Sequence, residues 1–136
     1  MRVVLDTNVI VSGMLNPFGI PGEIVRLSAS GFLTICYDVR ILSEYRRVLL
    51  RPVFDFDIKD VEDYLDYIKF AGRSIPTHPL SHKLPDPFDE PFLAVAASGS
   101  VEYLITGNIK HFPAKLCLGI EVVSPKQFLD VYRRTQ

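Results

Sequence analysis

The stretch Arg2-Val3-Val4-Leu5-Asp6-Thr7-Asn8 decides the predicted fold, because a short apolar run ends abruptly in three polar residues. Short apolar runs rich in β-branched side chains are typical of strands that are covered on both faces. Asp6 would then lie at the end of a buried strand, where its carboxylate must be solvated, paired or bound to a cation. Helix capping is the ordinary explanation, but a cap requires only one of the three polar residues. We therefore interpret Asp6 as a candidate functional residue.

Strands and helices alternate along the rest of the chain. Apolar runs predict strands over residues 33–37, 103–106 and 120–123, and a short edge strand over 73–75. Periodicity and capping residues predict helices over 22–30, 39–50 (with Asp38 as its N-cap), 60–70 and 91–98, and a C-terminal helix that begins with the capping box Ser124–Gln127. This alternation predicts an α/β fold with a mostly parallel sheet, which binds ligands beyond the carboxyl ends of its strands.

The composition narrows the class of protein. A chain of 136 residues with 48% hydrophobic and 23% charged residues predicts a single globular domain over residues 1–136. Two cysteines without metal-site spacing argue against a disulfide scaffold and a zinc site. No apolar run approaches the ~20 residues of a membrane span, and Asp6 comes too early for a secretory signal. We therefore expect a cytoplasmic protein with no membrane partner.

Three further polar groups follow apolar segments or interrupt them. Glu44 lies at the edge of a buried helical stripe, although an ion pair with Arg40 or Arg47 would also explain it. Asp86-Pro87-Phe88-Asp89-Glu90 precedes an alanine-rich helix, where fewer acids would suffice for the helix dipole. Asn108 follows a predicted strand, in a Gly-Asn pair that is common in turns.

These positions can meet at one edge of a parallel sheet. Carboxylates that lie close together repel each other unless they are protonated or neutralised. A cluster of oxygen ligands suits Mg²⁺ or Mn²⁺, which activate water and stabilise charge in phosphoryl displacement. The residues therefore predict a divalent-metal site.

The four motifs together resemble the PIN domain family, the metal-dependent ribonuclease fold of VapC-type toxins. They are Leu5-Asp6-Thr7-Asn8, Ser43-Glu44-Tyr45, Asp86-Pro87-Phe88-Asp89-Glu90, and Ile105-Thr106-Gly107-Asn108 with His111-Phe112-Pro113. The resemblance covers nearly the whole chain and implies a three-layer sandwich around a central, mostly parallel five-stranded sheet. It also implies a Mg²⁺- or Mn²⁺-dependent endoribonuclease that cleaves single-stranded RNA, as the toxin of a toxin–antitoxin pair.

The resemblance assigns roles to individual residues. Asp6, Glu44 and Asp89 correspond to catalytic acids that hold the metal, and Asp86 is a possible additional acid. Asn108 stands where many relatives have Asp; it can ligate metal through its carbonyl oxygen but adds no charge. Asn8 and Thr106 would support the site or contact substrate. A cognate antitoxin and a homodimer are implied by the family alone.

Two alternatives come from other functional classes. A response-regulator receiver also has an acidic pocket, but it requires a lysine soon after its fifth strand. Here Lys126 follows residues 120–123 only beyond Pro125. The second alternative is a catalytically weak or silent PIN-like domain that binds RNA or a protein partner, and Asn108 is its best support.

The balance of acidic and basic residues limits how the protein could bind a nucleic acid. The chain has 15 basic and 16 acidic residues, without the basic excess of a passive nucleic-acid binder. When the four predicted site acids are set aside, 15 basic residues remain against 12 acidic ones. Six of those 12 lie between Asp55 and Asp66, where we expect the solvated face of a helix. An acidic pocket in a mildly basic remainder should meet phosphate only with a divalent metal in place.

Overall fold

The computed structural model describes residues 1–136 and places strand β1 (Arg2–Leu5) at the centre of a five-stranded sheet. The strand order is β3-β2-β1-β4-β5, and every pairing is parallel. The other strands are β2 (Thr34–Tyr37), β3 (Arg73–Ser74), β4 (Tyr103–Ile105) and β5 (Val122–Val123). The predicted α/β class with a mostly parallel sheet is confirmed, and the sheet is parallel throughout.

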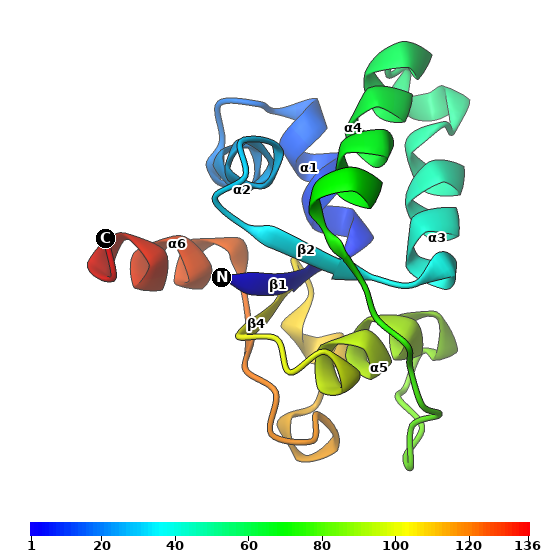
Figure 1. Ribbon diagram of the computed structural model, residues 1–136, viewed down its shortest axis with the longest axis vertical. Helices are drawn as coiled ribbons and strands as arrows, with labels where there is room; N and C mark the ends of the chain where they lie inside the picture. Colours follow the sequence, from blue (N-terminus) through cyan, green and yellow to red (C-terminus); the bar gives the residue numbers. More distant parts are fainter.

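Helices cover both faces of this sheet. Figure 1 shows α1 (Thr7–Leu15), α2 (Ile20–Ala29), α3 (Val39–Leu49) and α4 (Ile58–Ala71) on one side, and α5 (Glu90–Ser98) on the other. Helix α6 (Pro125–Arg134) packs against α2, β4 and β5. Four short 3₁₀ helices join these elements: η1 (Pro52–Phe54), η2 (Pro87–Asp89), η3 (Ile109–His111) and η4 (Ala114–Leu116). The arrangement is the expected three-layer sandwich.

Side-chain caps fix where several helices begin. Asp38 Oδ1 accepts a hydrogen bond of 3.0 Å from the Ile41 backbone N–H at the start of α3. Ser124 and Gln127 form both hydrogen bonds of a capping box at the start of α6. Each cap satisfies backbone donors that a first helical turn leaves without partners. These two caps confirm the predictions made from sequence.

Three predicted boundaries differ from the observed ones by two residues, and the others by no more than one. Helix α2 begins at Ile20 rather than 22, because Pro21 is favoured in the first turn of a helix. Gly22 lies inside this turn, close to the preceding chain: a Cβ on it would be 2.2 Å from the Pro17 carbonyl oxygen. Helix α4 begins at 58 rather than 60, because Asp57 is the residue that caps it. Strand β5 spans only two residues, because the chain turns through Leu118 and Gly119 at positive φ before it.

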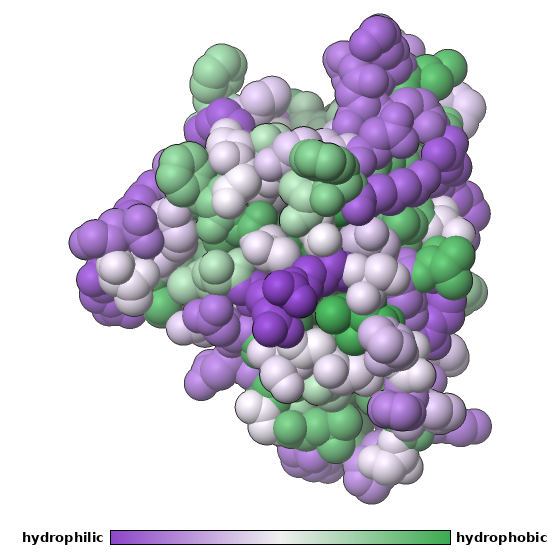
Figure 2. All heavy atoms as spheres, viewed as in Figure 1, coloured by the Kyte–Doolittle hydropathy of each residue, from purple (hydrophilic) through white to green (hydrophobic).

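One hydrophobic cluster of 29 buried residues forms the core. Val3, Val4 and Leu5 of β1 have no exposed surface, as expected for a central strand covered on both faces. In Figure 2, hydrophilic side chains dominate the upper right of the molecule, where α4 and α3 lie. No helix combines the length and apolar character that crossing a membrane would require.

The strand order creates a switch point beside β1. The chain builds β1, β2 and β3 toward one edge and then returns to place β4 on the other side of β1. The connections leaving β1 and β4 therefore diverge, which opens a crevice at the carboxyl ends of these two strands. Ligands of open α/β sheets bind in such crevices.

Candidate functional site

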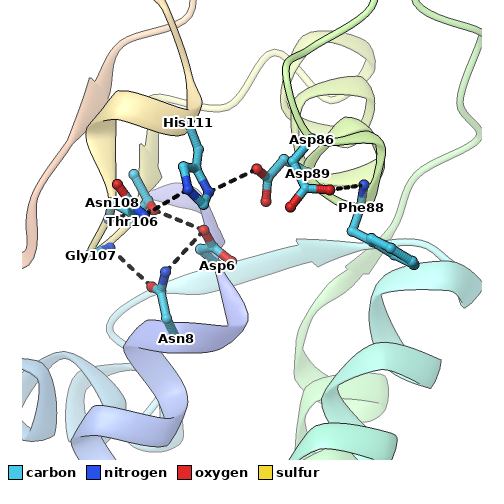
Figure 3. A network of polar contacts seen from close by, with 9 residues as sticks. All are labelled: Asp6, Asn8, Asp86, Phe88, Asp89, Thr106, Gly107, Asn108 and His111. Carbon is cyan, nitrogen blue, oxygen red and sulfur yellow. Dashed lines mark hydrogen bonds and ion pairs between the residues drawn. The ribbon is translucent and has the colours of Figure 1, made fainter.

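Asp6 lies at this crevice, directly after β1, and only 6% of its surface is exposed. It occupies the N-cap position of α1, but its side chain makes no capping hydrogen bond. Its Oδ2 instead accepts hydrogen bonds from Thr106 Oγ1, at 2.8 Å, and from Asn8 Nδ2, at 3.4 Å (Figure 3). Helix capping therefore does not account for this buried carboxylate.

Thr106 and Asn8 hold Asp6 in place because β1 and β4 are paired in register. Leu5 lies opposite Ile105, so the next residue of each strand, Asp6 and Thr106, also lie side by side. Thr106 is fully buried, and its Oγ1 accepts a hydrogen bond from the Asn108 backbone N–H at 3.0 Å. Asn8 Oδ1 accepts another from the Gly107 N–H at 3.0 Å. Both residues thus link Asp6 to the loop that follows β4, which fits the supporting role predicted for them.

Glu44 reaches the same crevice from α3. Its neighbour Tyr45 has no exposed surface and donates a hydrogen bond of 2.5 Å from its hydroxyl group to the Leu5 carbonyl oxygen. This bond fixes α3 against the end of β1. Glu44 accepts a hydrogen bond from Thr7 Oγ1, and Arg47 lies 3.9 Å away. The ion pair foreseen as an alternative is therefore present but long, and Glu44 still lines the pocket described below.

Asp86 and Asp89 lie at the start of α5, and the two carboxylates have different surroundings. Asp86 Oδ1 accepts a hydrogen bond of 2.9 Å from the Phe88 backbone N–H and so caps η2. Asp89 is only 8% exposed and caps nothing. Its buried Oδ2 accepts no well-aligned hydrogen bond, and its one ion-pair partner is His111. A buried carboxylate with so little compensation is costly, and a bound cation would relieve that cost.

His111 is a member of the site to which sequence reasoning gave no role. Its Nδ1 lies 3.1 Å from Asp89 Oδ2, and its Nε2 lies 2.8 Å from Asn108 Nδ2 (Figure 3). An amide nitrogen only donates, so Nε2 accepts this bond and Nδ1 is the ring nitrogen that faces Asp89. The 3₁₀ turn η3 makes this geometry possible, because it brings residues three apart together. The signals in the sequence were that spacing from Asn108 and the place of His111-Phe112-Pro113 in the motifs that resemble the family.

These side chains surround one pocket of about 470 Å³. The polar residues that line it include Asp6, Asn8, Glu44, Asp86, Asp89 and His111. Ligating atoms of Asp86, Asp89 and His111 all lie within 4.8 Å of one another. Asn108 and Thr106 do not line this pocket. The cluster therefore includes a nitrogen donor, which differs from the oxygen-only ligand set predicted from sequence.

Burial and mutual repulsion dominate the electrostatics of the pocket. Burial raises the pKa of Asp6, and the nearby Glu44 carboxylate raises it further, against the opposing hydrogen bond from Thr106. Burial, Asp6 and Asp86 together raise the pKa of Asp89 to about 6. Neither Asp6 nor Asp89 forms an ion pair with a lysine or arginine. Carboxylates in this state fit a divalent cation, which would supply the missing positive charge.

Comparisons with known proteins agree with this architecture. No curated protein sequence matches the chain. A crystal structure of VapBC2 from Rickettsia felis, bound to a DNA fragment from its promoter, contains a chain with the same fold. The two chains superpose with a TM-score of 0.57 and share 16% sequence identity, over 91% of this chain and 98% of that one. A family model described as the PIN domain matches residues 2–110, and on that match the chain belongs to the PIN domain family.

Proposed function

We propose that this protein is a divalent-metal-dependent endoribonuclease that cleaves single-stranded RNA, acting as the toxin of a toxin–antitoxin pair. Membership of the PIN domain family, whose members are generally nucleases, supports the nuclease class. The observation that carries the proposal is the burial of Asp6 and Asp89 without a lysine or arginine partner, in a pocket that they share with Glu44 and Asp86. A phosphodiester would be repelled from such a pocket unless a cation were bound there.

Asp6 and Asp89 would hold the metal, with Glu44 binding it directly or through water. Asp86 and His111 offer further ligand atoms beside Asp89. The nitrogen of His111 favours Mn²⁺ over Mg²⁺ as the better-bound ion. When bound, such an ion activates water and stabilises charge on the phosphate.

Polar side chains beside the proposed catalytic carboxylates hold those carboxylates in position. The Thr106 and Asn8 hydrogen bonds fix the Asp6 carboxylate, so it loses little freedom on binding a ligand. Glu44, which accepts a hydrogen bond from Thr7, would accept a hydrogen bond from the attacking water and then its proton. The proposed catalytic residues are therefore Asp6, Glu44 and Asp89, and Asn8 and Thr106 are positioning residues.

The proposed role as a toxin is supported by the comparison with a solved structure and not by the geometry of the pocket. The VapBC2 structure contains a toxin and an antitoxin, which supports a small antitoxin as the partner of this chain. We also propose that the protein acts on RNA in the cytoplasm and that it forms a homodimer.

A catalytically silent domain that binds RNA or a protein is the second proposal, and one contact favours it. Asn108 brings no charge to the site and directs its amide nitrogen to His111, whose other nitrogen faces Asp89. In this arrangement His111 lies beside the carboxylate that would otherwise bind metal. A silent domain would bind Mn²⁺ weakly and would cleave no RNA.

A nuclease assay on several single-stranded RNAs, with Mg²⁺, with Mn²⁺ and with chelator, tests the proposal. We expect cleavage that requires the metal, proceeds faster with Mn²⁺ and stops with chelator. A calorimetric Mn²⁺ titration of the metal-free protein tests binding independently. Tight Mn²⁺ binding without cleavage of any RNA would refute the nuclease but not the metal site.

A further inference from the structure

A groove leads from the acidic pocket across the face of α3. The pocket of about 470 Å³ shares Glu44, Arg47 and Phe88 with a neighbouring hollow of about 350 Å³. That hollow shares Arg40 with a third one, of about 370 Å³, which lies against residues 77–83. The three hollows therefore lie next to one another, and Phe88 lines both the acidic pocket and the hollow beside it.

Phe88 is a large apolar side chain in a polar groove. Its surface is 71% exposed, although it immediately precedes the buried Asp89. The backbone is fixed there, because the Phe88 N–H donates to Asp86 Oδ1. Figure 3 shows the ring directed away from Asp89, on the side of the α3 hollow that it lines. The ring thus has a defined position and an open surface next to the proposed site.

Positive charges line the groove beyond the acids. The side chain of Arg47 is 58% exposed and lies 3.9 Å from Glu44. Arg40 is tied to Asp38 at 2.7 Å yet leaves half of its side chain exposed. Arg51, in the acidic pocket, and Lys83, in the third hollow, are exposed and form no ion pair. This is the charge that a phosphate backbone requires, and it flanks the pocket that a phosphate enters only with metal bound.

We propose that Phe88 is the stacking platform for an unpaired base of the RNA, next to the phosphate at the acidic pocket, and that Arg40 and Arg47 contact the neighbouring phosphates. Proteins that bind single strands combine such an aromatic surface with a basic groove. A base within a duplex is already stacked, so the platform selects single-stranded RNA. This inference rests on the proposed function and names how the same site recognises its substrate.

The test compares two substitutions at Phe88 with the same substitutions at Phe70. Phe88→Leu keeps an apolar side chain but removes the ring, and Phe88→Trp keeps an aromatic surface. Phe70 is 88% exposed on α4 and lines none of the three hollows, so Phe70→Leu and Phe70→Trp are matched controls. The natural chain has no tryptophan, so each Trp variant carries a unique fluorescent probe. Binding is measured by fluorescence anisotropy with a labelled 12-nucleotide RNA and with its duplex.

We expect Phe88→Leu to weaken binding of the single strand about 5- to 150-fold, the range for loss of one stacked base, and to leave duplex binding unchanged. In Phe88→Trp, affinity is retained and the single strand quenches the tryptophan emission. The Phe70 variants bind as the unaltered protein does, without quenching.

Equal binding of the single strand by Phe88→Leu and by the unaltered protein, or unchanged emission of Phe88→Trp at saturating RNA, would overturn the stacking platform. If the unaltered protein cleaves RNA in that case, the nuclease proposal stands and only the platform fails. If the unaltered protein neither binds nor cleaves any single strand, both proposals fail. If it binds without cleaving and Phe88→Leu is weakened, the platform stands and the nuclease fails.

Discussion

Two regions of this molecule are rich in acidic residues, and they differ in almost every physical respect. The stretch from Asp55 to Asp66 has the higher density in sequence, with six acids. Five of them are exposed and Glu62 is half-buried. Two of these acids form ion pairs with basic side chains: Asp63 with Lys59 at 2.7 Å, and Glu62 with Arg46 at 2.5 Å. The crevice beside β1 has fewer acids, and its Asp6 and Asp89 are buried without a lysine or arginine partner.

The contrast shows that desolvation, rather than the number of acids, marks the candidate site. Water solvates the charges on α4, so they cost little and contribute little. In the crevice the same chemical group loses its hydration, and the pKa values of Asp6 and Asp89 rise because the charged form is disfavoured. A bound cation would compensate for the hydration that the crevice carboxylates lose, whereas the exposed carboxylates keep their hydration.

The largest expected effect is on cleavage. Asp6→Asn keeps the shape of the side chain and removes one charge, so we expect metal-dependent cleavage of single-stranded RNA to fall at least ~100-fold. Rates are measured under single-turnover conditions with Mn²⁺, and circular dichroism checks that the fold is retained. Cleavage by Asp6→Asn at the original rate would show that Asp6 is not a catalytic residue. The functional difference between the crevice and the Asp55–Asp66 stretch would then be lost.

Metal binding should stabilise the fold through the crevice alone. At 100 times its Kd, a cation that binds only the folded state adds about 2.7 kcal/mol to the free energy of unfolding. We therefore expect Mn²⁺ to raise the Tm of the chelator-treated protein by several degrees, and to have little effect on Asp89→Asn. Calorimetric scans with and without Mn²⁺ provide the measurement. An equal rise in Asp89→Asn would place the cation elsewhere, with α4 as the obvious alternative.

In the metal-free protein, Asp89 and Asp6 should both make the stability depend on pH, because the pKa of each is raised in the folded state. The pKa of Asp89, about 6 in the folded state, lies above the ordinary aspartate value, so the folded state binds the proton more tightly. The free energy of unfolding should therefore fall as pH rises from about 4 to about 6, by on the order of 1 kcal/mol after solvent screening. Urea titrations across this range would show the slope, and Asp89→Asn should reduce it to the part that Asp6 contributes. A slope unchanged in that variant would assign the effect to other groups.

The smallest effect is expected on α4. Asp63→Asn makes the same chemical change as Asp6→Asn, but on a side chain that is 61% exposed. We expect its cleavage rate to stay within about twofold of the original rate, because a solvated charge far from the reacting groups is screened by water and salt. The rate is measured alongside that of Asp6→Asn. A loss of rate comparable to that of Asp6→Asn would show that the α4 acids take part in function.

Much of the fold could be predicted from local sequence. The apolar run of β1, the cap at Asp38 and the capping box at Ser124 each depend on interactions within a few residues, and the structure confirms them. The exposed acidic face of α4 is confirmed for the same reason, since helical periodicity alone separates it from the buried stripe. The start of α2 was predicted wrongly, because the packing of Gly22 against Pro17 involves an interaction outside the predicted helix.

The candidate site was only partly predictable. Asp6, Glu44, Asp86 and Asp89 were singled out because acids stand out among apolar neighbours, and the structure brings all four to one pocket. Their catalytic roles remain predictions. His111 and Tyr45 received no role, since the histidine acts through a 3₁₀ turn and the tyrosine looks like an ordinary core residue.

The sequence by itself determined the α/β class, the elements near their observed bounds and the residues worth testing, because these follow from periodicity, capping and the cost of burying charge. Only the tertiary structure determined which acidic side chains are buried and therefore lose their hydration. That outcome depends on the register of β1 against β4, on the Tyr45 bond to Leu5 and on the turn that carries His111. Each of these joins residues far apart in the chain, so no local pattern could reveal that Asp6 and Asp89 are buried without a lysine or arginine partner.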